Sequence, residues 1–446
     1  MPFLFAALLL YTQWNNGGIS ERAWGRTMGF TCIASIAIWL FRPRGGFAPQ
    51  PSGALLAGMG LLVAIVGLQL APMPIDWIGI ISPARAELEL ALGGLGMARR
   101  WIPLSVSPTA TLAHLARLLT YLLVFLLARE SGWRLGRRIW HLAIPLVVVA
   151  AIEAGIGLNQ YSVAPAHGLY PNPNHFAGFL EMSLPFSLTL AMWPNRLGSA
   201  KIAQRVGLGL VSALILVAQI CSLSRAGFAA MAASTGVLLG IGIFRSRTSD
   251  TGTTLKVLAV ACTAVVIPVS LLFLAPDRFI DHLGSLTTAS GSISDARFSF
   301  WNETLHLIGK FPLFGTGLGT YVSAIQRYRD SVPMSLLDYA HNDYLQLAAE
   351  LGLVGMLPLA FAAFYCLRCS FRAALSKVEG ISSQMAAACA ASLVAIAVHS
   401  LADFNLYIPA NAMTVAWVAG LGCALELRAS LLEPRKIPVI AVQTES

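Results

Sequence analysis

The chain has 446 residues, of which 56% are hydrophobic and only 11% are charged. Soluble globular domains usually carry about 25% charged residues, and the mean hydropathy here is +0.69, so the composition excludes a soluble domain. The formal net charge is +9, but no basic patch with interleaved aromatic residues accompanies it, so nucleic-acid binding is not expected. The partner that the composition predicts is the lipid bilayer.

Long apolar stretches recur along the chain and predict membrane-spanning helices. A helix needs about 20 apolar residues to cross roughly 30 Å of hydrocarbon. Closed β-barrels, the other spanning solution, need short alternating strands, which this sequence lacks. We therefore predict an all-α polytopic membrane protein with about 12 transmembrane helices, of which the first is short. The predicted spans are residues 3–14, 26–41, 53–71, 111–128, 139–157, 175–193, 206–223, 226–244, 255–275, 351–369, 384–402 and 409–427.

The basic residues predict the orientation. When the loops are numbered alternately, 18 of the 30 Lys and Arg residues fall on one side, in short loops or the tail. By the positive-inside rule this side is cytoplasmic, both termini lie there, and the long loop faces outward. The predicted organisation is nine helices in residues 1–275, a large loop at 276–350, three helices in 351–428 and a cytoplasmic tail at 429–446.

The end of the long loop carries a polar segment that begins at His341. Asn342 or Asp343 can cap the helix that follows, which would leave N–H groups and the positive end of the helix dipole near His341. Asp343 and Glu350 are seven residues apart and share a helix face. A binding site and a capped helix with an interfacial histidine both explain this pattern.

Two arginines stand at unusual positions. Arg225 lies between two apolar stretches with almost no loop, where it must either snorkel to the interface or meet an anion. Arg297 is expected in the first turn of an amphipathic helix, where a cation opposes the helix dipole. An anionic partner explains both arginines, and snorkelling or a surface salt bridge are the alternatives. The apolar positions of the predicted helix are Phe298, Trp301, Leu305 and Ile308.

Further polar residues lie at the ends of predicted spans. Asn174 and His175 precede one span, and their amide and imidazole groups suit hydrogen bonds to sugar hydroxyls, or equally a capped turn. Similar interpretations apply to His399, Asp403 and Asn405, which lie at the outer loop near the C-terminus, His399 at the end of the span that precedes it. Arg117 lies within a span, as do Glu153 and Glu181.

No metal site is expected from the sequence. Cys366 and Cys369 form a C-x-x-C pair, but no second pair or histidine completes a zinc set, so buried thiols are the better interpretation. The glycine run at 315–319 has no preceding strand and predicts a turn rather than a nucleotide site.

Together these motifs resemble those of the O-antigen ligase and polymerase superfamily. The resemblance covers roughly residues 110–425, with the pieces in order and at similar spacing. The motifs are N-P-N-H-F-A-G at 172–178, S-R-A-G at 224–227, R-x-x-x-W at 297–301, P-L-F-G-T-G-L-G at 312–319 and H-N-D-Y-L-Q-L-A-A-E-L-G-L-V-G at 341–355.

The resemblance implies a bundle like that of the C-type glycosyltransferases, with a large helical periplasmic loop over the site and a place in the bacterial inner membrane. It implies transfer of a glycan from undecaprenyl pyrophosphate to an acceptor, without a metal or other cofactor. Arg225 and Arg297 would bind the pyrophosphate, and His341 would act on the acceptor hydroxyl as a base of suitable strength. Direct displacement at the anomeric carbon predicts inversion. The residues expected to help bind substrate are Asn342, Glu350, Asn174, His175 and Arg117.

The acceptor stays open at this point. A ligase, a surface-polysaccharide polymerase and a protein O-glycosyltransferase of this superfamily differ mainly in the acceptor. A lipid-linked glycan transporter would instead need helices broken at mid-membrane and repeats between the halves. A non-catalytic membrane scaffold would not need Arg225 and His341 together.

Overall fold

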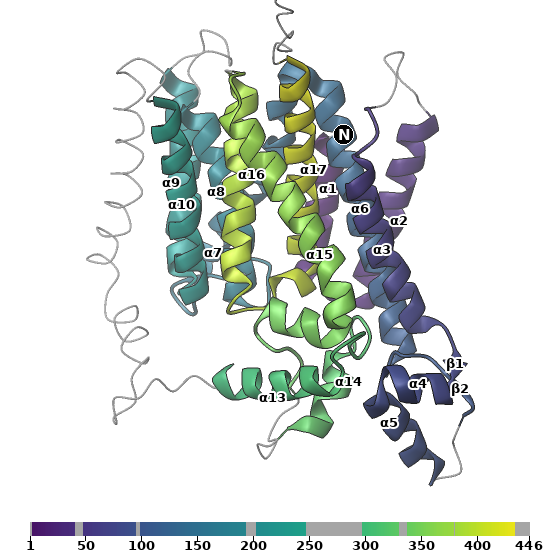
Figure 1. Cartoon of the computed structure of the whole chain (residues 1–446). Helices are drawn as coiled ribbons and strands as arrows, with labels where there is room; N and C mark the ends of the chain where they lie inside the picture. Colours follow the sequence, from purple (N-terminus) through teal and green to yellow (C-terminus); the bar gives the residue numbers. More distant parts are fainter. Residues whose placement is uncertain are drawn as a thin grey trace, which may run out of the picture.

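The computed structural model describes residues 2–40, 48–94, 99–192, 202–246, 297–329, 337–378 and 380–432. Its long helices run side by side and form one bundle (Figure 1). These helices are α1 (Pro2–Trp14), α2 (Glu21–Leu40), α3 (Gly53–Leu70), α6 (Pro108–Leu135), α7 (Ile144–Gln160), α8 (Pro173–Met192), α9 (Ile202–Cys221), α10 (Arg225–Ser246), α15 (Asp343–Leu375), α16 (Ile381–His399) and α17 (Pro409–Leu432).

Shorter elements gather at the lower end of the bundle in Figure 1, which we call the loop end. They are β1 (Met73–Pro74), α4 (Ile75–Ile81), α5 (Pro83–Gly93), β2 (Trp101–Ile102), α13 (Arg297–Lys310) and α14 (Tyr321–Ile325). Four 3-10 turns complete the described part: η1 (Asn16–Gly18), η2 (Gly136–Leu142), η3 (Gln326–Tyr328) and η4 (Asn405–Tyr407).

Eight helices of the described part are long and apolar enough to span a membrane, and each coincides with a predicted span. Of the four other predicted spans, residues 3–14 form the short α1, whose apolar part is Phe3–Trp14, and 255–275 lie outside the described residues. Helices α2 and α8 occupy 26–41 and 175–193 but are less apolar. A multi-pass helical membrane protein is therefore confirmed, while the count of twelve spans stays a prediction.

Small residues allow the central helices α6 and α17 to approach closely. A Cβ added at Gly420 would lie 2.3 Å from the carbonyl oxygen of Phe125, and one at Gly132 would lie 2.7 Å from Cβ of Ala424. Within a bilayer, helices gain little from the hydrophobic effect, so close van der Waals contact of this kind is what holds them together. Proline opens several helices, among them α6, α8 and α17, because its missing N–H would have no helical acceptor there.

Helix α15 is broken at Gly352, whose φ of 62° is outside the helical region. The loop of residues 311–320 fills the break, and its backbone replaces the helical hydrogen bonds that the break removes. The first two turns of α15 are thereby held as a separate short helix at the loop end. The bonds are Thr316 N to Ala349 O, Gly317 N to Glu350 O, Leu353 N to Pro312 O and Val354 N to Leu313 O, at 2.9 to 3.0 Å.

Residues 71–94 and 99–107, which lie between two predicted spans, form a folded unit that we call the side unit. Strands β1 and β2 pair antiparallel, and α4 and α5 lie between them in the sequence. Ala84 of α5 belongs to the same apolar cluster as Leu307 of α13 and Tyr321 of α14. The side unit therefore shares a core with α13 and α14, two helices of the predicted long loop.

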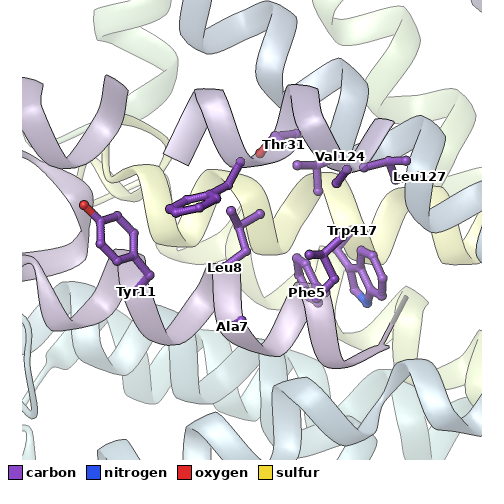
Figure 2. Close-up of a pocket in the computed structure, with 11 residues that line it drawn as sticks. Phe5, Ala7, Leu8, Tyr11, Thr31, Val124, Leu127 and Trp417 are labelled. Carbon is purple, nitrogen blue, oxygen red and sulfur yellow. The ribbon is translucent and has the colours of Figure 1, made fainter. Parts of the chain in front are cut away.

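An apolar cavity of about 330 Å³ lies between α1, α2, α6 and α17, away from the loop-end residues singled out by sequence (Figure 2). In it, Phe5 stacks on Trp417 with ring centroids 3.6 Å apart. The polar area of the lining comes from very few groups, such as Tyr11 and Thr31. A cavity of this character between membrane helices offers no group for catalysis.

Candidate functional site

His341 lies at the loop end, directly before α15. Its φ is 50°, a conformation that is costly for a residue with a side chain and persists only when the surroundings fix it. The next residue, Asn342, caps α15 by accepting the Leu345 N–H at 3.0 Å, and its own amide donates to the Leu401 carbonyl at 2.9 Å. The cap thus ties the histidine to the segment that connects α16 and α17.

That segment brings Asp403 to His341. Nδ1 of His341 lies 3.4 Å from Oδ1 of Asp403, and the histidine side chain is 30% exposed while the aspartate is fully buried. Burial alone would raise the pKa of the Asp403 carboxyl, but its contacts with His341, with His175 and with the Phe404 amide lower that pKa below the ordinary 3.8. The result is a buried, ionised carboxylate behind a partly accessible imidazole.

His175 is the third group of this cluster. It lies in the first turn of α8, is buried, and places Nε2 3.8 Å from Oδ1 of Asp403. Neither of its ring nitrogens has a hydrogen-bond partner among the described residues. The neighbouring Asn174 is half-buried, and its backbone N–H donates to Oδ1 of Asn172 at 2.9 Å, which forms the turn that starts α8.

An aromatic wall surrounds the three polar groups. The Phe404 ring packs edge-on against His175 and His341, with centroids 4.5 and 4.9 Å apart. Tyr339 stacks on the other side of Phe404 at 3.9 Å. These contacts restrict water around the histidines and fix the direction of their rings.

Arg297 approaches the site through α13. The indole of Trp301 donates to the carbonyl of Ala340, the residue before His341, at 3.1 Å. Arg297 begins the same helix four residues earlier, so it lies on the same face as Trp301, one turn away. The buried face of α13 agrees only in part with the predicted apolar face. Phe298 and Leu305 were predicted to be buried but are exposed, whereas Leu307 is fully buried.

Arg225 begins α10, on the same end of the bundle as the first turn of α8. Gly227 lies so close to α8 that a Cβ there would be 2.9 Å from Cβ of Ala177. The hydroxyl of Ser224 accepts the Gly227 N–H at 3.1 Å and caps α10. The start of α10 is therefore packed two residues away from His175 along α8.

Arg117, on α6, affects the aromatic wall through its charge. Its Nη1 lies 3.3 Å from Nε2 of His114, and its guanidinium stands 5.8 Å from the Trp24 ring centroid. Burial raises the pKa of the Tyr339 hydroxyl, and the positive charge of Arg117 opposes that rise. Arg117 is thus electrostatically coupled to the side chain that stacks on Phe404.

Glu350 stands apart from this cluster and is engaged with the backbone. Its carboxylate accepts hydrogen bonds from the amides of Gly319 and Tyr321, at 2.7 and 3.0 Å, and from the Tyr407 hydroxyl at 2.6 Å. The side chain is fully buried. These bonds satisfy both carboxyl oxygens and hold the loop of residues 311–320 in the break of α15.

The contact between Asp403 and His341 is the part of the site that the sequence analysis did not assign. Asp403 was noted only as a polar residue between two spans, and nothing local in the sequence pairs it with a residue 62 positions earlier. No group of three or more His, Cys, Asp or Glu residues suited to a metal ion occurs within the described ranges. The groups that the structure offers are therefore an imidazole, a carboxylate and nearby guanidinium-bearing helix ends.

The comparison with known families bears on this end of the bundle. Residues 210–360 match the family model described as O-antigen ligase. No curated protein matches the chain. The matched range includes Arg225, Arg297 and His341, and begins within α9 and ends within α15. This match over about a third of the chain supports its membership of the O-antigen ligase superfamily.

Proposed function

We propose that this protein is a membrane glycosyltransferase that moves a glycan from an undecaprenyl-pyrophosphate donor to an acceptor hydroxyl in surface polysaccharide biosynthesis. The family match supports a glycosyltransferase-like role. The observation that carries the assignment to this site is the His341–Asp403 contact of 3.4 Å at the loop end. A partly exposed imidazole backed by a buried carboxylate is the arrangement by which proteins orient a general base.

In the proposed reaction His341 accepts the proton of the acceptor hydroxyl as its oxygen attacks the anomeric carbon of the donor. The bond between that carbon and the pyrophosphate oxygen breaks, and its electron pair leaves with the pyrophosphate. Asp403 is a positioning residue, which holds the ring and stabilises the imidazolium that forms. One displacement of this kind inverts the anomeric configuration.

The leaving group develops negative charge, which the arginines are suited to stabilise. Arg225 and Arg297 both begin helices at the loop end, where the N-terminal amides also favour an anion. A guanidinium can make two parallel hydrogen bonds to a phosphate and stabilises charge without a metal ion. We propose that these two residues bind the pyrophosphate and that no metal takes part.

The other residues predicted to bind substrate have different surroundings, which favour different roles. His175 has unpartnered ring nitrogens beside Asp403, which suits a hydrogen bond to the sugar or the acceptor. Arg117 can act through Tyr339, and Asn174 lies at the rim of the same turn. The contacts of Asn342 and Glu350 favour roles in fixing His341 and the 311–320 loop. We further propose the orientation given by the positive-inside rule, with the site at the periplasmic face of the inner membrane and both termini cytoplasmic.

The test is a transfer assay with the purified chain in lipid, an undecaprenyl-pyrophosphate glycan and two kinds of acceptor, a lipid-anchored core glycan and a second copy of the donor. Product is expected with a chelator present and is expected to be absent in His341→Ala. Growth of the donor glycan would identify a polymerase, and modification of the core a ligase. Movement of donor across the bilayer without a new glycosidic bond would show a transporter and refute the proposal.

A further inference from the structure

Several large apolar side chains of the side unit are exposed, and three of them lie close together on α4 and β2. Trp77 is 60% exposed, Ile80 is 82% exposed and Trp101 is 62% exposed. Trp77 and Ile80 are three residues apart on α4 and therefore share a face. The ladder that pairs Pro74 with Trp101 brings the second tryptophan next to the first turn of α4.

This exposure is not the result of a poorly folded segment. The other side of the same elements is closed, since Ile78 and Ile102 are fully buried and share a cluster with Leu104. In β2, Trp101 is exposed while its neighbour is buried. The side unit has a core of its own and still leaves two tryptophans and an isoleucine uncovered.

The place of the side unit in the chain indicates what covers these side chains. It connects α3, which ends at Leu70, to α6, which begins at Pro108, and both helices are candidate spans. Trp77 lies seven positions after the end of α3 and Trp101 seven positions before the start of α6, while Ile80 lies one turn further along α4. Figure 1 shows α4 and the strand pair beside the lower ends of these two helices. Tryptophan is enriched at this depth because its ring is apolar and its N–H needs a polar partner.

We propose that the side unit is a membrane anchor, in which Trp77, Ile80 and Trp101 insert into the interfacial region of the leaflet at the loop end. Arg99 and Arg100 adjoin Trp101 and are exposed. Arg99 remains 62% exposed although it contacts the buried Glu89 at 3.0 Å. Both guanidinium groups can therefore meet lipid phosphates in the same region.

The side unit is connected to the elements next to the candidate site, α13 and the loop of residues 311–320. Its α5 shares an apolar cluster with α13. The Val106 N–H donates to the Thr316 carbonyl at 2.9 Å, and the Thr316 N–H donates to α15 at the break. Insertion of the side unit would therefore fix the distance of α13 and the 311–320 loop from the bilayer. The relevance of this distance to catalysis rests on the proposed function, because a lipid-linked donor would reach the site from the bilayer surface. The membrane anchor itself does not depend on the proposed function.

Depth measurement on the full chain in lipid vesicles tests the anchor. Ile80→Cys and Glu87→Cys are each labelled with a nitroxide in a background without the seven native cysteines. Glu87 is the matched control, because it is an exposed residue of α5 in the same unit. The label at position 80 is expected to collide more with dissolved oxygen and less with a water-soluble nickel chelate than the label at position 87. Equal accessibility to the nickel chelate at both positions would overturn the proposal.

A second measurement leaves the cysteines in place. Fluorescence of the ten tryptophans is recorded in vesicles of brominated lipid for the native chain and for Trp77→Ser with Trp101→Ser. The double variant is expected to lose part of the lipid-dependent quenching while its thermal unfolding is unchanged. Equal quenching in the double variant and the native chain would overturn membrane insertion. Insertion would also be overturned if the label at position 80 were protected from the nickel chelate only when two copies of the chain are crosslinked. Neither measurement uses glycan transfer, so a failure of the anchor proposal can be distinguished from a failure of the proposed function.

Discussion

Replacement of Asp403 by asparagine removes one negative charge from the site and little else. The asparagine oxygen can still accept the Phe404 N–H that now bonds to Oδ1 at 2.9 Å. The backbone carbonyl of residue 403, which accepts the Asp343 N–H, is unaffected. The variant is therefore expected to fold, and its effect should fall on the two histidines beside the carboxylate, His341 and His175.

The size of that effect follows from the 3.4 Å separation of Nδ1 and Oδ1. At an effective dielectric constant of about 20, Coulomb's law gives about 5 kcal/mol for two unit charges at this distance. The histidine side chain is 30% exposed, so solvent screening reduces the gain to about 2–4 kcal/mol. Because the imidazolium exists only as the proton is transferred, the loss falls on kcat, which should decrease about 30- to 1000-fold.

The assay is steady-state glycan transfer by Asp403→Asn, with kcat and KM determined separately. Asp338→Asn is the matched control, because Asp338 is an exposed acid three residues before His341. The control should retain the native kcat, and KM should change little in both variants. A native kcat in Asp403→Asn beside an inactive His341→Ala would refute the role given to the carboxylate.

Other predictions concern stability and use thermal unfolding of the purified chain. Glu350→Gln should cost about 2–3 kcal/mol and Tyr407→Phe about 1 kcal/mol, because the carboxylate accepts three hydrogen bonds and the hydroxyl donates one; equal losses would contradict this. Gly352→Ala should prevent folding, since its φ is 62° and a Cβ would lie 2.3 Å from the Leu313 carbonyl oxygen, whereas Gly67→Ala, with open space around it, should be tolerated. The folded-state pKa of Asp403 is lowered, so its contribution is fully present above about pH 5 and is lost progressively as the pH falls from about 4 toward the lowered folded-state pKa. The difference in unfolding temperature between the native chain and Asp403→Asn should therefore shrink on acidification, and a constant difference would contradict an ionised Asp403 carboxylate.

The sequence predicted those features that depend on neighbouring residues. The eight spans are set by the length and hydropathy of single stretches, and the structure has a helix at each. The cap of α15 was predicted to be Asn342 or Asp343, and Asn342 fills it. A helix was predicted to start near Arg297, and α13 begins there.

The features that the sequence could not predict depend on contacts between distant segments. The face of α13 that is buried was predicted only in part, because Leu307 is buried in a cluster with residues from distant segments, such as Ala84 of α5 and Tyr321 of α14. The break at Gly352 is stable because a loop that ends 32 residues earlier supplies the missing hydrogen bonds. In the same way, the pairing of Asp403 with His341 results from the packing of the last two spans against α15.

Transfer from a defined undecaprenyl-pyrophosphate glycan, measured in the presence of a chelator for the native chain and for His341→Ala, tests the central claim most directly. The account predicts an inverted glycosidic product from the native chain and none from the variant, with both proteins folded. A product that requires a divalent metal, or that His341→Ala forms at the native rate, would contradict it.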